Sequence, residues 1–228
     1  VLTKMDLADP KLTREWIAYY EQNGHPAIAV NSNQGTLPAI EKKIKEVLKE
    51  KIAAKEARGI KNSRIKAMCI GIPNVGKSTL LNRLVKKNVA IVGNKPGVTK
   101  AQQWLKAGSS LLLLDTPGIL WPKFDDPIVG KKLALTGAVK DTLYAKDDVA
   151  LYELEYFVDN HPQALTERYK LDESDLDQPT VELLLSITKK MGFKEDYDRA
   201  SERLIFECRK GKLGRFTLDA VPKDPAKV

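Results

Sequence analysis

The stretch Gly71-Ile-Pro-Asn-Val-Gly-Lys-Ser78 decides the fold of the domain that contains it. It fits the pattern G-x-x-x-x-G-K-[ST], and it continues from an apolar run at Ile65–Ile72 that predicts a strand. The residues after it carry Leu80, Leu81 and Leu84 at helical spacing. This pattern binds phosphate groups when it lies between a strand and a helix, so we interpret it as a P-loop.

Such a loop offers backbone N–H groups to phosphate oxygens at close range, and the helix N-terminus adds a partial positive charge. We expect Lys77 to reach the β- and γ-phosphates and the Ser78 hydroxyl to ligate Mg²⁺. The predicted nucleotide-binding residues of this segment are Asn74, Val75, Gly76, Lys77, Ser78 and Thr79.

Two later segments complete the predicted metal site. Asp115-Thr-Pro-Gly118 follows the apolar run Leu111–Leu114, and an aspartate at the end of a strand beside a P-loop is placed to hold Mg²⁺. The N–H of Gly118 can meet the γ-phosphate without side-chain hindrance. Thr99, just after a Pro-Gly pair, would complete Mg²⁺ coordination when a γ-phosphate is present, and an ordinary Pro-Gly turn is the alternative. Lys77, Thr99 and Gly118 are the candidate catalytic residues.

We interpret Thr3-Lys4-Met5-Asp6 as the element that reads the base. The carboxylate of Asp6 can accept from the N1–H and the exocyclic amine of guanine, whereas adenine offers no such pair of donors. The stem of Lys4 would lie against the base plane. The tetrapeptide resembles the [NT]KxD element of translation-factor-class GTPases, with Thr3 where most members have Asn. Asn31-Ser32-Asn33 resembles the last guanine-contacting loop of the same class.

The order of these elements discriminates among GTPases. Conventional GTPases place the base-reading elements after the P-loop, whereas here residues 3–6 and 31–33 precede it, so the motif order is circularly permuted. The combination resembles the YlqF/RbgA family of permuted GTPases. The stretches that carry the resemblance are GIPNVGKSTLLNRL (71–84), KPGVTKAQQWL (95–105), LLDTPGILWPKF (113–124), LALTGAVKD (133–141) and RKGKLGRFTLD (209–219).

The resemblance implies a GTP-binding and GTP-hydrolysing assembly factor for the large ribosomal subunit, slow alone and stimulated by ribosomal particles. It implies the large subunit or its precursor and rRNA as partners, and GTP or GDP with Mg²⁺ as cofactors. Asn74 can ligate K⁺ beside the phosphates in loops of this type, and a loop-shaping role is the alternative. Two other functions stay open: a nucleotide-gated RNA-binding module with negligible hydrolysis, and a permuted GTPase that serves another RNA-related task.

The hydrophobic periodicity divides the chain into two predicted domains. Residues 1–124 alternate strand and helix patterns, which predicts an α/β P-loop GTPase domain with a parallel sheet. Residues 125–228 predict a small helical domain. The predicted elements are strands at Pro26–Asn31, Ile65–Ile72, Leu111–Leu114 and an extended Gly214–Leu218, and helices from Pro10 to Asn23, Leu37 to Ile52, Pro127 to Val139, Asp147 to Asp159, Pro162 to Tyr169, Pro179 to Met191 and Tyr197 to Arg209.

The net charge of +8 is unevenly distributed. Residues 1–119 carry 20 Lys and Arg against 9 Asp and Glu, and the basic side chains are densest at Lys42–Lys66. A basic face suits a polyanion, and a solvated helix face explains it equally well. In the second half, Arg209, Lys210, Lys212 and Arg215 are candidate RNA-phosphate contacts, with an exposed basic segment as the alternative.

Composition excludes several other classes of protein. No apolar run approaches the ~20 residues of a membrane span, so we expect no membrane partner. The two cysteines, Cys69 and Cys208, lie far apart without metal-ligand neighbours, which indicates reduced thiols and a cytoplasmic location. The chain has no long heptad pattern, so we expect a monomer, and we expect no DNA partner.

The first residues suggest that something precedes them. An [NT]KxD loop follows a buried strand, and Val1-Leu2 is only the end of one. We therefore expect the natural protein to carry an N-terminal segment of several tens of residues. Ras-like enzymes orient water with a Gln just after the DxxG glycine, where this chain has Ile119, so we assign no general base. The resemblance implies that the group that activates water comes from the upstream segment, which includes a histidine.

Overall fold

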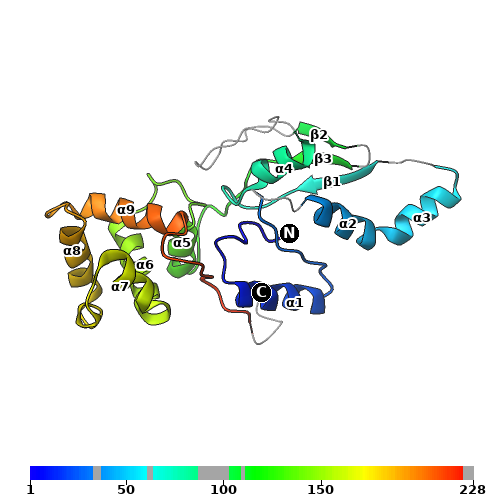
Figure 1. Cartoon of the computed structure of the whole chain (residues 1–228). Helices are drawn as coiled ribbons and strands as arrows, with labels where there is room; N and C mark the ends of the chain where they lie inside the picture. Colours follow the sequence, from blue (N-terminus) through cyan, green and yellow to red (C-terminus); the bar gives the residue numbers. More distant parts are fainter. Residues whose placement is uncertain (33–36, 61–63, 87–102, 109–110, 223–228) are drawn as a thin grey trace. The chain divides into compact units, whose positions relative to one another are not determined.

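The computed structural model describes residues 1–32, 37–60, 64–86, 103–108 and 111–222, with the side chain of Leu37 left out. The chain forms two compact units, labelled along the ribbon in Figure 1. Unit 1 is Val1–Leu120 together with the chain from Phe216 onward, and unit 2 is Trp121–Arg215.

Unit 1 is built on a three-stranded sheet of β1 (Ile65–Cys69), β2 (Gln103–Ala107) and β3 (Leu111–Asp115), in the order β1-β3-β2. β1 and β3 are parallel, with Cys69 opposite Asp115. β2 is antiparallel to β3, so the prediction of a wholly parallel sheet is wrong. Only three residues separate β2 from β3, and a connection that short can join antiparallel strands but not parallel ones.

The core of unit 1 lies between this sheet and the P-loop helix α4 (Lys77–Val85). The predicted apolar residues of the helix, Leu80, Leu81 and Leu84, are buried against alternate residues of the strands. The alternation of burial along β3 shows that α4 covers one face of the sheet. On the other face, Met68 and Trp104 are more than half exposed.

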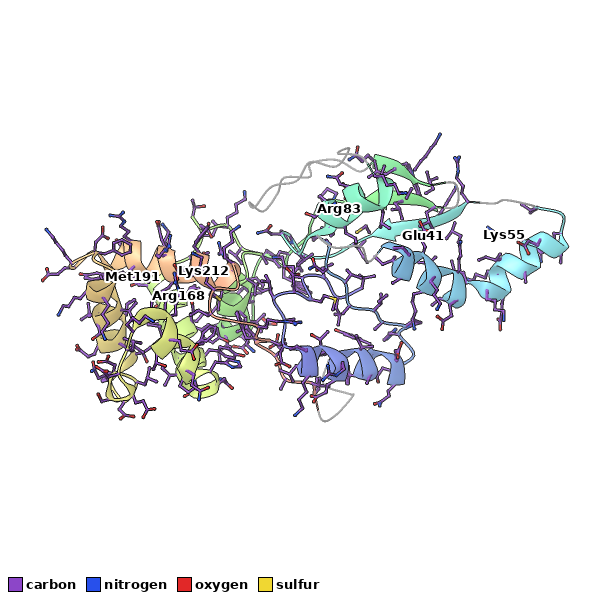
Figure 2. The ribbon with its side chains drawn as sticks, in the orientation of Figure 1. Glu41, Lys55, Arg83, Arg168, Met191 and Lys212 are labelled. Atoms are coloured by element: carbon purple, nitrogen blue, oxygen red, sulfur yellow. The ribbon has the colours of Figure 1, made fainter. Side chains whose placement is uncertain are left out.

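The first 60 residues contribute helices α1 (Pro10–Gln22), α2 (Leu37–Val47) and α3 (Lys49–Ala57). α1 begins as predicted, since the Asp9 side chain accepts from the Leu12 N–H at 2.7 Å. The predicted single helix from Leu37 to Ile52 is broken at Leu48. α3 buries none of its residues, and Figure 2 shows its side chains, Lys55 among them, clear of other elements, so no packing keeps the two helices in line.

The segment Pro26–Asn31 is not a strand of the sheet, contrary to the sequence prediction. It forms an isolated parallel bridge in which Ala29 pairs with Leu2. The Leu2 N–H donates to Ile28 O and the Val30 N–H donates to Leu2 O, both at 2.8 Å. Val30 is fully buried, so the pairing joins the start of the chain to the core of unit 1.

Unit 2 is helical throughout its described elements. Its helices are α5 (Pro127–Leu135), α6 (Lys146–Asn160), α7 (Pro162–Tyr169), α8 (Thr180–Lys190) and α9 (Tyr197–Arg209), with a 3₁₀ turn at Glu173–Asp175. Each begins within a residue or so of its predicted start, because Pro or Asp at the first positions marks it. α6 contacts the other four helices, and its Leu154 and Phe157 are fully buried among them.

The carboxylate of Glu207, on α9, joins two helices of unit 2. Arg168 on α7 donates to it from Nε at 2.7 Å and from Nη2 at 2.6 Å, and Arg203 donates from Nε at 2.7 Å. Burial alone would raise the pKa of Glu207, but the two guanidinium groups outweigh it and lower the pKa. The carboxylate is therefore charged and paired at neutral pH, which fixes α7 against α9.

The C-terminal segment leaves the helical unit and returns to unit 1, so the predicted range 125–228 for one helical domain is too long. The Phe216 N–H donates to Leu7 O at 3.0 Å, and the Trp16 indole N–H donates to Asp219 O at 3.1 Å. The predicted extended stretch Gly214–Leu218 is assigned no strand.

The pKa of a second buried carboxyl in unit 2, Glu153 on α6, is raised, whereas that of Glu207 is lowered. Glu153 is fully buried, neither oxygen has a hydrogen-bond partner among the described residues, and burial raises its pKa to about 8. The folded state therefore keeps a proton that the unfolded chain releases at its ordinary pKa. The contribution of Glu153 to stability should be greatest below about pH 4.5 and fall as the pH rises to about 8.

We predict that Glu153→Gln raises the melting temperature at pH 8 and leaves it nearly unchanged at pH 5. The amide never ionises, so the variant lacks the ionisation penalty, which reaches at most about 1.4 kcal/mol per pH unit in that window. Thermal unfolding of both proteins across the pH range measures the difference. Parallel pH profiles for the two proteins would contradict a raised pKa at Glu153.

Candidate nucleotide-binding site

The P-loop joins β1 to α4 through backbone conformations that suit particular residues. Gly76, the residue before the helix, has φ of 96°, a value that favours glycine. Asn74 has φ of 57°, in the left-handed region that Asn tolerates better than most residues. The predicted phosphate-binding residues Ser78 and Thr79 lie half-buried in the first turn of α4. The N-terminal N–H groups of that turn can receive an anion.

The side chain of Lys77 turns back over the loop. Its ammonium donates to Gly71 O at 3.0 Å and to Ile72 O at 2.7 Å. Burial lowers the pKa of Lys77, while the Cys69 thiol and the Asp115 carboxylate act in the other direction. The carbonyl contacts hold the cation at the mouth of the loop, where phosphate oxygens would be better partners for it.

Asp115 ends β3 and is fully buried. Neither of its carboxylate oxygens has a hydrogen bond of regular geometry among the described residues, although Gln103 and the Thr116 amide are near enough to lower its pKa. Burial is the larger effect and raises the pKa of Asp115. Burial of a carboxylate without a hydrogen-bond partner or counter-ion destabilises the folded state. A bound cation would neutralise the carboxylate, so this position fits Mg²⁺.

Apart from Asp115, the candidate ligands for Mg²⁺ at this position are the Ser78 hydroxyl, phosphate oxygens and water. Among the described residues, no three His, Cys, Asp or Glu side chains gather at one point. A site with Asp115 and the Ser78 hydroxyl would leave its other positions to phosphate and water, which is the usual environment of Mg²⁺. The predicted third ligand, Thr99, lies outside the described residues.

Gly118 lies directly against the P-loop. A Cβ at this position would lie 2.7 Å from Pro73 Cα, 2.8 Å from Pro73 N and 3.0 Å from the Lys77 ammonium. The first two distances are shorter than any side chain tolerates, and the atoms are backbone that cannot move aside. The sequence therefore has glycine here because the segment after β3 and the P-loop touch. Ile119 follows with 79% of its surface exposed.

The base-reading segment is bound to the P-loop. Thr3 Oγ1 donates to Val75 O at 2.5 Å, so the threonine that stands where most family members have Asn contacts the P-loop. Lys4 has φ of 54° and is exposed. The Asp6 side chain is exposed rather than buried, and its carboxylate has no hydrogen bond or ion pair with any described residue. It remains available to donors on a base.

The second base-reading segment lies beside the first. The Met5 N–H donates to Val30 O at 3.2 Å, which brings Asn31 and Ser32 next to the Thr3–Asp6 turn. The Ser32 hydroxyl is buried without a hydrogen-bond partner among the described residues. Asn33, the last predicted residue of this loop, lies outside the described residues.

Two residues at the site escaped the sequence prediction. Gln103 on β2 contacts Asp115 because β2 pairs with β3, and the antiparallel pairing was not foreseen. Pro73 supplies the backbone that Gly118 touches. The sequence gives a signal only for Pro73, through its place inside the loop motif.

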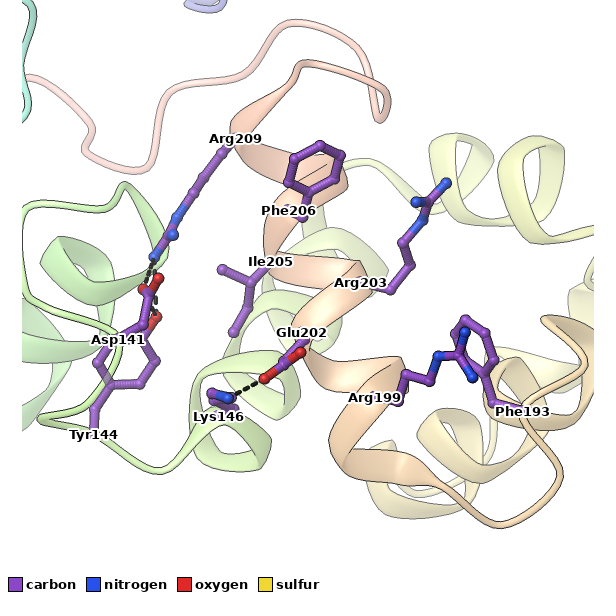
Figure 3. Close-up of a pocket in the computed structure, with 10 residues that line it drawn as sticks. All are labelled: Asp141, Tyr144, Lys146, Phe193, Arg199, Glu202, Arg203, Ile205, Phe206 and Arg209. Carbon is purple, nitrogen blue, oxygen red and sulfur yellow. Dashed lines mark hydrogen bonds and ion pairs between the residues drawn. The ribbon is translucent and has the colours of Figure 1, made fainter. Parts of the chain in front are cut away.

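The basic segment predicted to bind RNA divides into two kinds of residue. Arg209 donates to Ala134 O at 2.7 Å and to Leu135 O at 2.9 Å. It also donates to Asp141 Oδ1 at 3.0 Å and to Tyr144 Oη at 2.9 Å, and Figure 3 shows these three side chains together. Its guanidinium binds the C-terminus of α5, so a phosphate contact by Arg209 is a poor prediction. Because Arg209 donates to the carbonyl groups that end α5, its guanidinium stabilises the fold instead.

The other three residues are more accessible. Lys210 is exposed, with its ammonium 5.6 Å from the Phe206 ring centroid. Lys212 lies 3.9 Å from Glu207 Oε1, and Lys212 and Arg215 line an open recess of about 700 Å³ with Lys170 and the start of α7. These residues keep the charge that a phosphate backbone requires.

Comparisons with known proteins agree with the geometry. A family model described as 50S ribosome-binding GTPase matches residues 66–189. "Ribosome biogenesis GTPase A" of Bacillus cereus is 48% identical over 225 residues, which cover 96% of this chain and 75% of the relative. The protein of the same name from Priestia megaterium is 46% identical over 226 residues, covering 96% and 78%.

Two solved structures share the fold. A GDP-bound structure of TM YlqF gives a TM-score of 0.66 at 21% identity, covering 97% of this chain and 82% of that one. The GNP-bound YlqF from T. maritima gives 0.61 at 21% identity, covering 97% and 80%. Separately, none of the helices in the described part of the chain is long and apolar enough to cross a membrane.

We predict that Asp115→Asn removes the stabilisation that Mg²⁺ adds to the nucleotide-bound protein, while it raises the melting temperature of the metal-free protein at pH 8. The amide replaces a buried carboxylate that has no partner, but it is a weaker ligand for the ion. Thermal unfolding with GDP, with and without MgCl₂, measures both effects. Asp125→Asn, at an exposed position, is the matched control, and equal Mg²⁺ shifts in all three proteins would rule out Asp115 as a ligand.

Proposed function

Because this chain belongs to the YlqF/RbgA family of ribosome biogenesis GTPases, we propose that it uses GTP to time its binding to the large ribosomal subunit or its precursor. It is a GTP-hydrolysing enzyme of ribosome biogenesis. The proposal adds the large subunit as the site of action, rRNA as the contact, and a switch that links the nucleotide to the helical unit. We expect it to act as a cytoplasmic monomer.

In the proposed complex, each site residue has one role. Asp6 accepts from the guanine edge, with the Lys4 stem and the loop at Asn31–Asn33 beside the base. The P-loop amides from Asn74 to Thr79 surround the phosphates. Lys77 balances the charge that develops on the β- and γ-phosphate oxygens, and Ser78, Thr99 and Asp115 hold Mg²⁺.

The contact of Gly118 with Pro73 and Lys77 is the observation that carries the switch. A γ-phosphate beside Lys77 offers the Gly118 N–H an acceptor, and GDP offers none. Unit 2 begins at Trp121, only three residues beyond Gly118. A change in the backbone at Gly118 is therefore passed to unit 2 through a connection too short to absorb it.

Hydrolysis requires a group that orients water, and Ile119 has no polar atom in its side chain to do so. We propose that turnover of the isolated chain is slow and that a ribosomal particle raises it. Binding to the particle uses Lys210, Lys212 and Arg215, whose charges are accessible, rather than Arg209, whose guanidinium binds α5.

We predict that the protein sediments with purified large ribosomal subunits more strongly with a non-hydrolysable GTP analogue than with GDP, and that binding weakens steeply with salt. Gly118→Ala should bind both nucleotides to similar extents yet lose the difference in sedimentation, because the added methyl group forces the segment off the P-loop. Fluorescent nucleotide titration gives the affinities.

The control is Gly192→Ala, at a glycine in unit 2 with φ of 79°, where an added methyl group strains the backbone but meets no atom within 4 Å. It should keep the nucleotide-dependent difference. Binding of the natural protein that ignores the nucleotide would leave GTPase activity intact but refute the timing role.

Potassium gives a separate test of Asn74. If Asn74 holds K⁺ beside the phosphates, GTP hydrolysis should be faster in KCl than in NaCl at equal ionic strength, and Asn74→Ala should remove the difference. Single-turnover hydrolysis in the two salts measures it. Equal rates in both salts would leave Asn74 with its left-handed conformation as its only role in the loop.

A further inference from the structure

The outer face of α9 carries a stripe of cations around one exposed aromatic ring. Arg199, Arg203, Phe206 and the C-cap residue Lys210 follow one another at intervals of four, three and four residues. At about 100° per residue, these positions lie within an arc of about 60° and extend over about 17 Å. The opposite side of the helix is its buried face, which includes Leu204 and Cys208.

The aromatic ring of the stripe is unusually exposed. Phe206 keeps 46% of its surface accessible, because its position on α9 lies opposite the buried face of the helix. Arg203 Cζ lies 5.8 Å from its ring centroid and the Lys210 ammonium lies 5.6 Å from it. The ring is therefore flanked by positive charge at a distance typical of cation–π contacts.

Of the three cations of the stripe, only Arg203 pairs with a carboxylate of the described residues. Arg199 lies over the Phe193 ring at 4.5 Å, and no carboxylate among the described residues pairs with its guanidinium. Arg203 uses only Nε for Glu207, which leaves its two terminal nitrogens without a partner among those residues. The one carboxylate that interrupts the stripe, Glu202, pairs with Lys146.

Figure 3 shows that Phe206, Arg203 and Arg199 project from one side of α9, away from Asp141 and Tyr144. Arg199, Arg203 and Phe206 also line an open recess of about 510 Å³, whose other lining residues include Asp141, Tyr144 and Glu202. Accessible cations beside an exposed ring complement a chain that has both phosphates and flat bases. Unpaired nucleotides have both, whereas the bases of a duplex are stacked on one another and unavailable.

We propose that Arg199, Arg203, Phe206 and Lys210 form a contact surface for single-stranded RNA, in which an unpaired base stacks on Phe206 and the cations meet the flanking phosphates. The proposal rests on the rRNA contact proposed above for unit 2, and it places that contact on a helix face outside the basic segment Arg209–Arg215, apart from Lys210. It also selects loops or ends of an RNA over its helices.

The test measures binding of the full chain to a short unstructured RNA and to a blunt duplex of the same sequence by fluorescence anisotropy. Phe206→Leu should weaken single-strand binding by between about 5-fold and 150-fold, the range expected for loss of one base–aromatic stack. Phe206→Tyr, which keeps the ring, should stay close to the natural protein. Neither should alter duplex binding.

Tyr197→Leu is the matched control. Tyr197 is on the same helix and 50% exposed, but its position nine residues before Phe206 places it on the other side of α9. It should leave RNA binding unchanged. For the cations, Arg199→Gln should weaken binding and reduce its dependence on salt, whereas Lys189→Gln, at an exposed position on α8, should do neither.

Sedimentation with large ribosomal subunits separates failure of this surface from failure of the proposed function. If the natural protein binds subunits and Phe206→Leu binds both subunits and single-stranded RNA equally well, the surface is refuted and the function stands. If Phe206→Leu loses subunits while the natural protein has no affinity for single-stranded RNA, the face contacts a ribosomal protein and the proposal is wrong. If Phe206→Leu loses single-strand binding but the natural protein does not bind subunits, the surface is upheld and the proposed function is refuted.

Discussion

The parallel pairing of β1 with β3 is the constraint on which the nucleotide site depends. It sets Cys69 opposite Asp115, so the two segments that leave these strands emerge at the same edge of the sheet. One segment becomes the P-loop, and the other reaches Gly118. Their backbones then approach until no side chain fits between Gly118 and Pro73. The same pairing buries the Asp115 carboxylate without a hydrogen bond of regular geometry among the described residues, an arrangement that fits a bound cation.

The permuted order of the motifs is compatible with this site because the contacts that hold the segment Thr3–Asp6 do not depend on chain order. The hydrogen bond from Thr3 to Val75 holds it to the P-loop, and the pairing of Leu2 with Ala29 holds it to the core. Neither contact requires that the segment follow the P-loop in the chain. What the permutation changes is the other end of the domain, where the segment that lies against the P-loop now leads directly into unit 2.

Unit 2 shows that the charge of a residue does not reveal its role. Arg168 binds Glu207, and Arg209 binds the end of α5, so both arginines stabilise the packing of helices. Arg199 and Lys210 have no carboxylate partner among the described residues and remain accessible. The difference comes from helix faces and neighbours rather than from the residues themselves, so a basic segment such as Arg209–Arg215 contains both kinds.

The sequence by itself determined the P-loop, the order of the motifs, and the helices of unit 2 from α5 to α9, because these depend on local spacing, caps and glycines that contacts elsewhere do not alter. Only the tertiary structure decided the antiparallel β2, the break at Leu48 and the return of the chain at Phe216, since each depends on pairing or burial between distant residues. The tertiary structure also decided the partners of Arg209 and the exposure of Phe206. Arg209 is thereby a structural cation, whereas Phe206 belongs to an accessible surface.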